Sequence, residues 1–166
     1  LEFMNLNLNE LVQQVNGEFA ERFEGRNLDL ICILQPEPLL IRADSRRIWR
    51  VLENLYVNVC KYAMPGTRVY VDAIKKDGKI QLSIKNISEN PLNFQADELT
   101  ERFIRGDVSR STEGSGLGLS IAKNLTVLQH GSFNIYLDGD LFKVTITFDE
   151  AVKEKKPMPP MIVPEV

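Results

Sequence analysis

The sequence predicts an α+β domain: a two-layer sandwich in which a mixed sheet carries its helices on one face. Three observations support this prediction. Some segments place apolar residues at helical spacing, shorter segments have the alternation or composition of strands, and proline and glycine separate them. The chain has 166 residues, the usual size of one domain, and no internal repeat is visible.

The first part of the chain predicts one helix and two short strands. In residues 7–23 apolar positions recur every three or four residues, and Asn7 begins the helix as a cap. Residues 28–34 and 39–41 are predicted as strands. The segment 35–38 between them holds two prolines, which prevent one continuous ladder.

A second helix is predicted over residues 45–62, with Asp44 or Ser45 as its cap and Pro65-Gly66 at its end. Two hairpins are predicted as well, each because Asp-Gly stands between alternating strands. They span residues 69–84, turning at Asp77-Gly78, and residues 133–148, turning at Asp138-Gly139. The apolar face of the helix consists of Ile48, Val51, Leu52, Leu55 and Val59.

An irregular polar stretch, residues 87–113, separates the hairpins, and a long loop inside a compact domain is usually functional. A last helix is predicted from about residue 116 to 129. Residues 1–6 are predicted as linker or cloning-derived residues and residues 149–166 as a Pro- and Lys-rich tail. The domain itself is therefore expected over residues 7–148.

Composition excludes some classes of function. The formal net charge of −3 favours binding neither to nucleic acid nor to a membrane surface. No run approaches the roughly 18 apolar residues of a membrane span. Cys32 and Cys60 lie far apart in apolar segments, so we expect buried free thiols, as is typical of a reducing cytoplasm.

Two features point to chemistry. Asn54, Asn58 and Lys61 stand at i, i+4 and i+7 of the second predicted helix, within a sector of about 60°. Amide oxygens are ligands suited to Mg²⁺, and lysine is a point charge suited to phosphate. The same stripe is also compatible with an ordinary solvated helix face.

The second feature is the string Gly114-Ser115-Gly116-Leu117-Gly118-Leu119, which opens the last predicted helix. Glycines let backbone N–H groups approach an anion closely, and a helix N-terminus favours negative charge. The string follows a long loop rather than a strand, and it lacks the Gly-Lys-Ser/Thr of a P-loop. Both of those familiar nucleotide motifs therefore fit poorly.

Together the two features resemble the histidine-kinase branch of the superfamily that includes gyrase, the heat-shock chaperone ATPase and the mismatch-repair ATPase. Residues 54–62 resemble its N box, residues 101–107 its F box and residues 114–123 its second glycine box. The resemblance covers roughly residues 7–148 and implies a Bergerat-type ATP-binding fold. It further implies a catalytic domain that binds ATP and Mg²⁺ and phosphorylates a histidine.

Carried over by position, the resemblance implies that Asn58 holds Mg²⁺, with Asn54 near the metal and the phosphates. Lys61 would contact the phosphates, and Tyr62 would line the adenine or ribose. The segment from about 88 to 113 would be a lid over the nucleotide. Phe103 and Arg105 would help the lid to close, while Gly114, Ser115, Gly116, Leu117 and Gly118 would supply phosphate-facing backbone and a hinge.

The resemblance also bears on the reaction. Members of the superfamily that hydrolyse ATP carry a glutamate at the position of Asn54, whose amide cannot act as a base. Transfer of the γ-phosphate is therefore expected, and the neighbouring Glu53 has a base-like or orienting role as one alternative. His130 precedes Gly131 in the pattern of a helix C-cap, so the acceptor histidine is expected on a separate dimerisation domain of the same parent protein. A response regulator would be the further partner, and the parent would be anchored in a membrane.

The sequence departs from the family at the first glycine box. Asn86 stands where the family has an aspartate that accepts from the adenine amino group, and the following glycines are absent. An amide oxygen can still accept that hydrogen bond, without charge assistance. The alternatives are that Asn86 is a strand-end turn residue and that the domain is a degenerate nucleotide-binding or scaffolding module without transferase activity.

Overall fold

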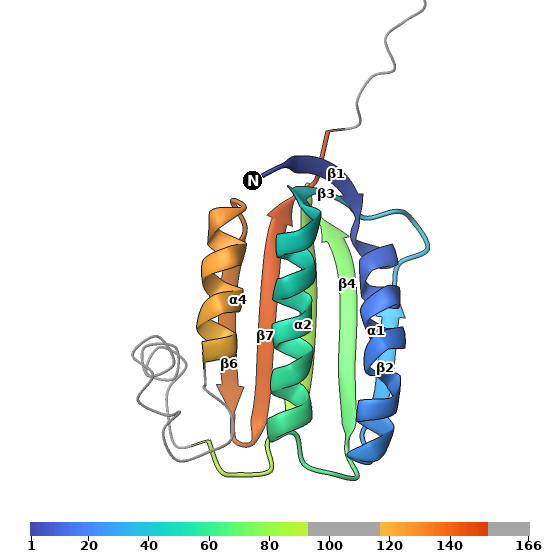
Figure 1. Cartoon of the computed structure of the whole chain (residues 1–166), viewed down its shortest axis with the longest axis vertical. Coiled ribbons are helices and arrows are strands. Elements are labelled where there is room, and N and C mark those ends of the chain that lie inside the picture. Colours follow the sequence, from blue (N-terminus) through green and yellow to red (C-terminus); the bar gives the residue numbers. More distant parts are fainter. Residues whose placement is uncertain (93–116, 153–166) are drawn as a thin grey trace, which may run out of the picture.

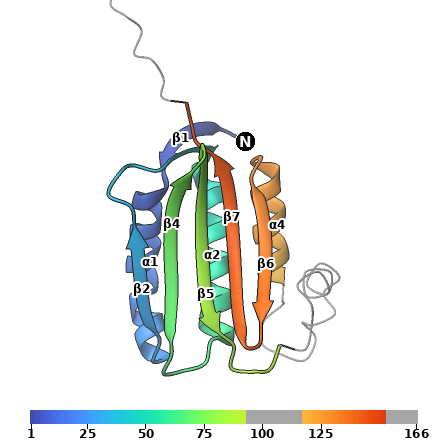
Figure 2. The ribbon, with the colours of Figure 1, turned by 180° about the vertical axis from the view of Figure 1, so that it is seen from behind.

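The computed structural model describes residues 1–92 and 117–152. They form two layers: one face of a five-stranded sheet carries all three helices, and the opposite face is bare (Figures 1 and 2). The predicted two-layer α+β sandwich is confirmed. The elements are β1 (Phe3–Asn7), α1 (Leu8–Gly25), β2 (Asp29–Leu34), β3 (Leu40–Asp44), α2 (Ser45–Tyr62), β4 (Arg68–Lys76), β5 (Lys79–Ile87), α4 (Leu117–Leu128), β6 (Ser132–Asp138) and β7 (Leu141–Asp149).

The main sheet has the strand order β2-β4-β5-β7-β6 and is mixed, as predicted. Strands β2 and β4 run parallel, whereas the other neighbours are antiparallel. The parallel pair needs a crossover, and the connection from β2 through β3 and α2 to β4 supplies it. That crossover places α2 across the middle of the sheet (Figure 1).

The fold extends beyond both predicted ends. Residues 3–7 were expected to be mostly linker, but they form β1, which pairs antiparallel with β3 in a separate two-stranded sheet. At the other end Glu150 forms a bridge with Ile41, and the Ala151 N–H donates to the Leu40 carbonyl at 2.8 Å. Sequence reasoning missed β1 because five residues are too few to show a period, and their pairing partner lies far along the chain.

Helix α2 begins and ends where the sequence predicts. The Asp44 carboxylate is its N-cap and accepts from the backbone N–H groups of Arg46 and Arg47 at 3.0 and 3.1 Å. All five predicted apolar positions are buried, and Tyr56 is buried with them. The Tyr56 ring packs against Phe19 and Phe23 of α1, which joins the two helices in the core.

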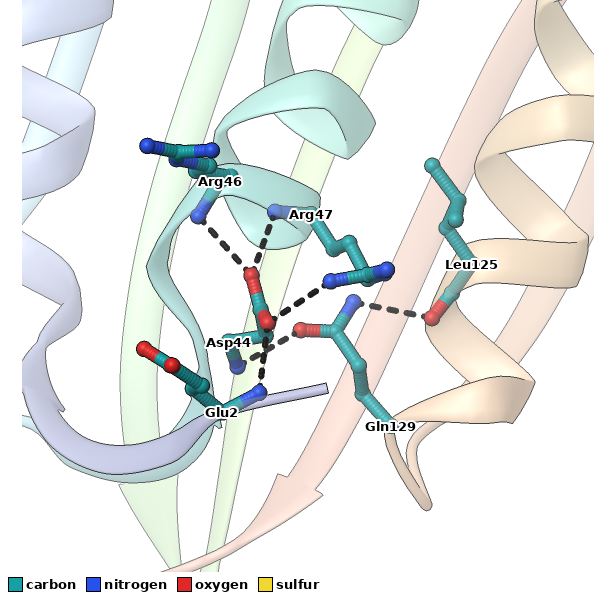
Figure 3. Close-up of polar contacts among 6 residues, drawn as sticks. All are labelled: Glu2, Asp44, Arg46, Arg47, Leu125 and Gln129. Atoms are coloured by element: carbon teal, nitrogen blue, oxygen red, sulfur yellow. Dashed lines mark hydrogen bonds and ion pairs between the residues drawn. The ribbon is translucent and has the colours of Figure 1, made fainter.

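The same carboxylate links three parts of the chain, as Figure 3 shows. The oxygen that does not cap the helix, Oδ2, accepts from the Glu2 N–H and from the Arg47 guanidinium, both at 2.8 Å. The Asp44 N–H donates to the Gln129 side chain at 3.0 Å, and that amide in turn donates to the Leu125 carbonyl of α4 at 2.8 Å. The bond from the Glu2 N–H, followed by those from Arg47, lowers the pKa of Asp44 to about 2.

Both hairpins form, with one shift. Asp77 and Gly78 have φ angles of 53° and 74°, which is the conformation of a type I′ turn and suits the twist of the strands. In the second hairpin Asp138 pairs with Leu141, so the turn consists of Gly139 and Asp140, one residue later than predicted. Gly139 supplies the positive φ of 58°.

The cysteines differ from expectation. Cys32 is exposed and Cys60 is half-buried, so the prediction of two buried thiols was wrong. Cys32 lies on β2, which is an edge strand of the main sheet, and an edge strand has a neighbour on one side only. Both cysteines are free thiols, as expected.

Candidate functional site

Three segments that carry predicted site residues meet at one end of the domain, the lower end in Figure 1: the C-terminus of α2, the C-terminus of β5 and the N-terminus of α4. Backbone hydrogen bonds join the first two segments. The Met64 N–H donates to the Ile87 carbonyl at 2.7 Å, and the Glu89 N–H donates to the Tyr62 carbonyl at 2.8 Å. The end of the helix and the end of the strand are therefore held together.

The polar stripe of α2 lies partly inside the protein. Asn54 and Asn58 are half-buried, Tyr62 is half-buried and Lys61 is exposed. The two amides are therefore less exposed than the lysine of the same stripe. Glu53, the neighbour considered for a base-like role, is exposed.

Helix α4 brings the end of the glycine string against this stripe. A methyl group placed on Gly118 would lie 3.7 Å from the Asn54 Oδ1 and 3.9 Å from the Asn54 carbonyl oxygen. The first turn of α4 is therefore in contact with the stripe of α2. Residues that stand 64 positions apart in the sequence become neighbours, as the predicted site requires.

Asn86 reaches the same region from the sheet. It pairs with Phe142 inside the ladder of β5 and β7, so it is a strand residue and not a turn residue. Asn86 and Asn58 line one small void between α2 and the sheet, together with apolar residues, and the void is too small to hold a water molecule. The two asparagines therefore lie close together, and Asn86 marks the inner end of the candidate site.

Two buried polar atoms of the site have no hydrogen-bond partner among the described residues: Asn86 Oδ1 and Asn54 Nδ2. Asn86 is 3% exposed. A buried polar group without a partner costs about 1–3 kcal/mol, and proteins rarely retain one without reason. Asn86 Oδ1 is an acceptor on β5 and Asn54 Nδ2 is a donor on α2, so a bound molecule that donates to the first and accepts from the second would satisfy both.

Several predicted site residues lie outside the described residues, so their placement stays a prediction. Leu117 is the first residue of α4, and the lid is described only up to residue 92. The site residues outside the described part are Phe103, Arg105, Gly114, Ser115 and Gly116.

His130 lies at the opposite end of the domain and has a structural role. Its φ is 67°, and its N–H donates to the Val127 carbonyl at 3.0 Å. The Gly131 N–H donates to the Thr126 carbonyl at 2.9 Å, which completes the C-terminal cap of α4. The imidazole stacks on Phe3 of β1 with 5.6 Å between the ring centres.

Comparison with known proteins shows the family. The sequence model of the protein family described as histidine kinase-, DNA gyrase B- and HSP90-like ATPase matches residues 43–152, which is more than half of the chain. The chain belongs to this family. Within it, relatives and solved structures that match the chain are histidine kinases, so the chain is a histidine kinase catalytic domain of the kind found in two-component systems. This confirms the resemblance drawn from the sequence.

Two relatives illustrate the similarity. BaeS of Escherichia coli, a signal transduction histidine-protein kinase, is 31% identical over 123 residues, which cover 73% of this chain and 26% of that protein. The sensor histidine kinase RppB of Synechocystis is 29% identical over 130 residues, with 77% and 29% covered. The histidine kinase catalytic domain described here therefore spans less than a third of either relative.

Solved structures agree. The nucleotide-free catalytic domain of the histidine kinase ThkA matches with a TM-score of 0.78 and 26% identity, covering 90% of this chain and 97% of that one. ThkA in complex with the response regulator TrrA matches with a TM-score of 0.72 and 25% identity, covering 93% of this chain and 44% of that one.

Within residues 1–92 and 117–152, no helix has the length and apolar character needed to cross a membrane.

Proposed function

We propose that this histidine kinase catalytic domain binds Mg²⁺ and ATP and transfers the γ-phosphate to a histidine on a separate dimerisation domain. One observation carries the proposal: the buried acceptor Asn86 Oδ1 and the buried donor Asn54 Nδ2 have no hydrogen-bond partner within residues 1–92 and 117–152. ATP offers both complements, because adenine carries an amino donor and the phosphates carry acceptor oxygens.

At the inner end, Asn86 accepts from the adenine amino group and Tyr62 lines the adenine or ribose. Asn86 lies within the sheet, and the Tyr62 carbonyl accepts from the Glu89 N–H, so the backbone at both positions is held before the nucleotide arrives. A fixed acceptor costs little to order on binding.

At the phosphate end, the Asn58 amide oxygen serves as a ligand of Mg²⁺, and Lys61 contacts the phosphates. Mg²⁺ keeps most of its water and takes few protein ligands besides substrate phosphates, so one amide is a sufficient contribution from α2. The ion would neutralise charge on the phosphates. Gly118 with Gly114, Ser115, Gly116 and Leu117 would supply backbone N–H groups at the start of α4.

Transfer is favoured over hydrolysis. Asn54, which stands near the phosphates, has an amide that cannot take a proton from water at neutral pH. Glu53 is exposed and about 100° away on the helix, so it points away from Asn54. Phosphoryl transfer depends mostly on positioning and on stabilising charge, which the stripe of α2 and the start of α4 would provide. Phe103 and Arg105 would close the lid.

The partners follow from the same proposal. The acceptor histidine comes from a dimerisation domain of the same parent protein, because His130, the one histidine of the sequence, follows the C-terminus of α4 at the end of the domain opposite the candidate site. ThkA has been solved with a response regulator, and we propose a response regulator as the second partner here. The parent protein would be a membrane-anchored sensor with this domain in the cytoplasm.

The test is a transfer assay. The domain is mixed with Mg²⁺, [γ-³²P]ATP and a dimerisation domain that bears the acceptor histidine, and the product is tested for acid-labile, base-stable label. Asn58→Ala should lose at least tenfold in labelling. Asn134→Ala, which removes an exposed amide on β6, is the matched control and should label like the wild type.

A second candidate has one observation in its favour. Asn86 replaces the aspartate of the first glycine box, which is the kind of change expected in a module that binds nucleotide without catalysis. Binding of ATP by the wild type without any label on a competent acceptor would favour this module. Absence of ATP binding would exclude both candidates.

A further inference from the structure

We infer that Arg26 is a positioning residue of the nucleotide site, an inference that rests on the proposed function. Arg26 follows α1 and belongs to none of the motifs discussed above. Helices α1 and α2 lie side by side and end at the same end of the domain (Figure 1). Arg26 therefore lies next to the last turn of α2, and that turn carries Lys61 and Tyr62.

The contacts of Arg26 are directed at carbonyl groups that a helix end leaves without partners. Its Nε donates to the Cys60 carbonyl at 2.8 Å, and a terminal nitrogen donates to the Ala63 carbonyl at 3.0 Å. The Tyr62 carbonyl between them accepts from the Glu89 N–H at 2.8 Å. The end of α2 is thus held from outside by α1 and by the segment after β5.

The charge of Arg26 suits this position. The C-terminus of a helix carries partial negative charge, so a guanidinium there is favourable. The planar group can also reach two carbonyls at once, which the single ammonium of a lysine does less well. Arg26 therefore fixes the direction of the last turn of α2 as well as its electrostatic environment.

Arg26 also touches the first residues after β5. A terminal nitrogen of Arg26 lies 3.5 Å from the Glu89 carboxylate, and the two side chains are 36% and 48% exposed. A long ion pair at that exposure contributes little. The two carbonyl bonds are shorter and partly buried, so they should carry most of the effect, and the ion pair should carry the smaller part.

The consequence for function concerns binding rather than chemistry. Without Arg26 the last turn of α2 loses two of its external hydrogen bonds, and the backbone that carries Lys61 and Tyr62 is held less firmly. Both residues are proposed to contact the bound nucleotide before and during transfer alike. Loss of such uniform contacts raises KM with little change in kcat.

The experiment measures the Kd for Mg·ATP, KM and kcat for transfer to the dimerisation domain, and the Tm without nucleotide. Arg26→Ala should raise Kd and KM about three- to tenfold and leave kcat within about twofold, since charged hydrogen bonds are lost. Arg26→Lys should recover part of the affinity. Glu89→Gln should change Kd by less than about twofold.

Two variants serve as controls. Arg22→Ala removes the same charge one turn earlier on α1, where the guanidinium lies over the Phe19 ring, and should leave Kd unchanged. Gln129→Ala lowers the Tm by breaking the network of Figure 3 at the opposite end, and should also leave Kd unchanged. If Arg26→Ala binds Mg·ATP like the wild type, or loses affinity only as Gln129→Ala does, the inference is wrong.

The wild-type measurement separates this inference from the function on which it rests. A wild type that does not bind Mg·ATP overturns the proposed function and the role of Arg26 with it. A wild type that binds, together with an Arg26→Ala variant that is unchanged, overturns only the role of Arg26. Amide exchange at residues 60–64 gives an independent readout, and it should accelerate in Arg26→Ala but not in Arg22→Ala.

Discussion

Replacing Asn86 by leucine separates stability from nucleotide binding. The Asn86 Oδ1 is buried and has no partner among the described residues, which costs about 1–3 kcal/mol. Leucine has the same branched skeleton and no polar atom, so Asn86→Leu should stabilise the nucleotide-free domain by about 1–2 kcal/mol. For a domain of this size that raises the Tm by roughly 2–8 °C.

The same substitution should weaken binding of ATP. The adenine amino group would face an apolar side chain, and an unmade buried hydrogen bond costs about 1–3 kcal/mol, which corresponds to tenfold or more in Kd at the middle of that range. Guanine carries an oxygen in place of that amino group, so the preference for ATP over GTP should fall. Thermal unfolding and calorimetric titration with each nucleotide measure the two effects.

A matched control restores the acceptor. Asn86→Asp keeps an oxygen at the same position and should retain the preference for ATP, although a buried carboxylate should lower the Tm. If Asn86→Leu binds ATP and GTP with the same ratio of affinities as the wild type, Asn86 does not recognise the adenine. The inner end of the site must then be assigned to other residues.

Three further predictions concern the scaffold. Gly17→Ala in the exposed middle of α1 should raise the free energy of unfolding by about 0.5–1 kcal/mol. Gly131→Ala should lower it by about 1–3 kcal/mol, because the new methyl group would lie 2.7 Å from the buried Phe148 ring. Thermal unfolding measures both effects. Since the pKa of Asp44 is lowered to about 2, its stabilising contribution should be complete above about pH 4 and disappear as the pH falls towards 2. The difference in Tm between the wild type and Asp44→Asn should therefore stay constant from pH 5 to about pH 4 and decrease as the pH falls from there to 2. Cys32 should react with a thiol reagent faster than Cys60 because it is more exposed. Since desolvation raises the pKa of both thiols, both rates should rise at a higher pH than that of a small free thiol, which a pH series of reaction rates measures.

Local patterns predicted most of the elements. The limits of α2 follow from a cap at Asp44 and from Pro65-Gly66, and both signals lie within a few residues of the helix end. The turn at Asp77-Gly78 follows from the positive φ angles that a two-residue hairpin requires. Such signals involve only neighbouring residues, so they can be recognised in a single sequence without knowledge of the rest of the fold.

Other features depend on contacts between distant segments, and the sequence does not contain them in readable form. Strand β1 exists because β3 offers it an edge, and Cys32 is exposed because β2 has a neighbour on one side. Arg26 follows its helix as an ordinary basic residue. Its importance appears only when α1 and α2 are placed side by side and the carbonyls of α2 come within reach.

The sequence by itself determined the kinds of groups in the site: two amides and a lysine on one helix face, an asparagine near the end of a strand and a glycine string before a helix. Residue type and spacing carry that information, because chemistry and helical period are local. The tertiary structure decided that Gly118 meets Asn54 and that Asn86 is buried, with an oxygen that has no partner in the described part of the chain. Burial and satisfaction of hydrogen bonds are properties of the packed chain, so only the fold could show which polar atoms of the candidate site lack a partner among the described residues.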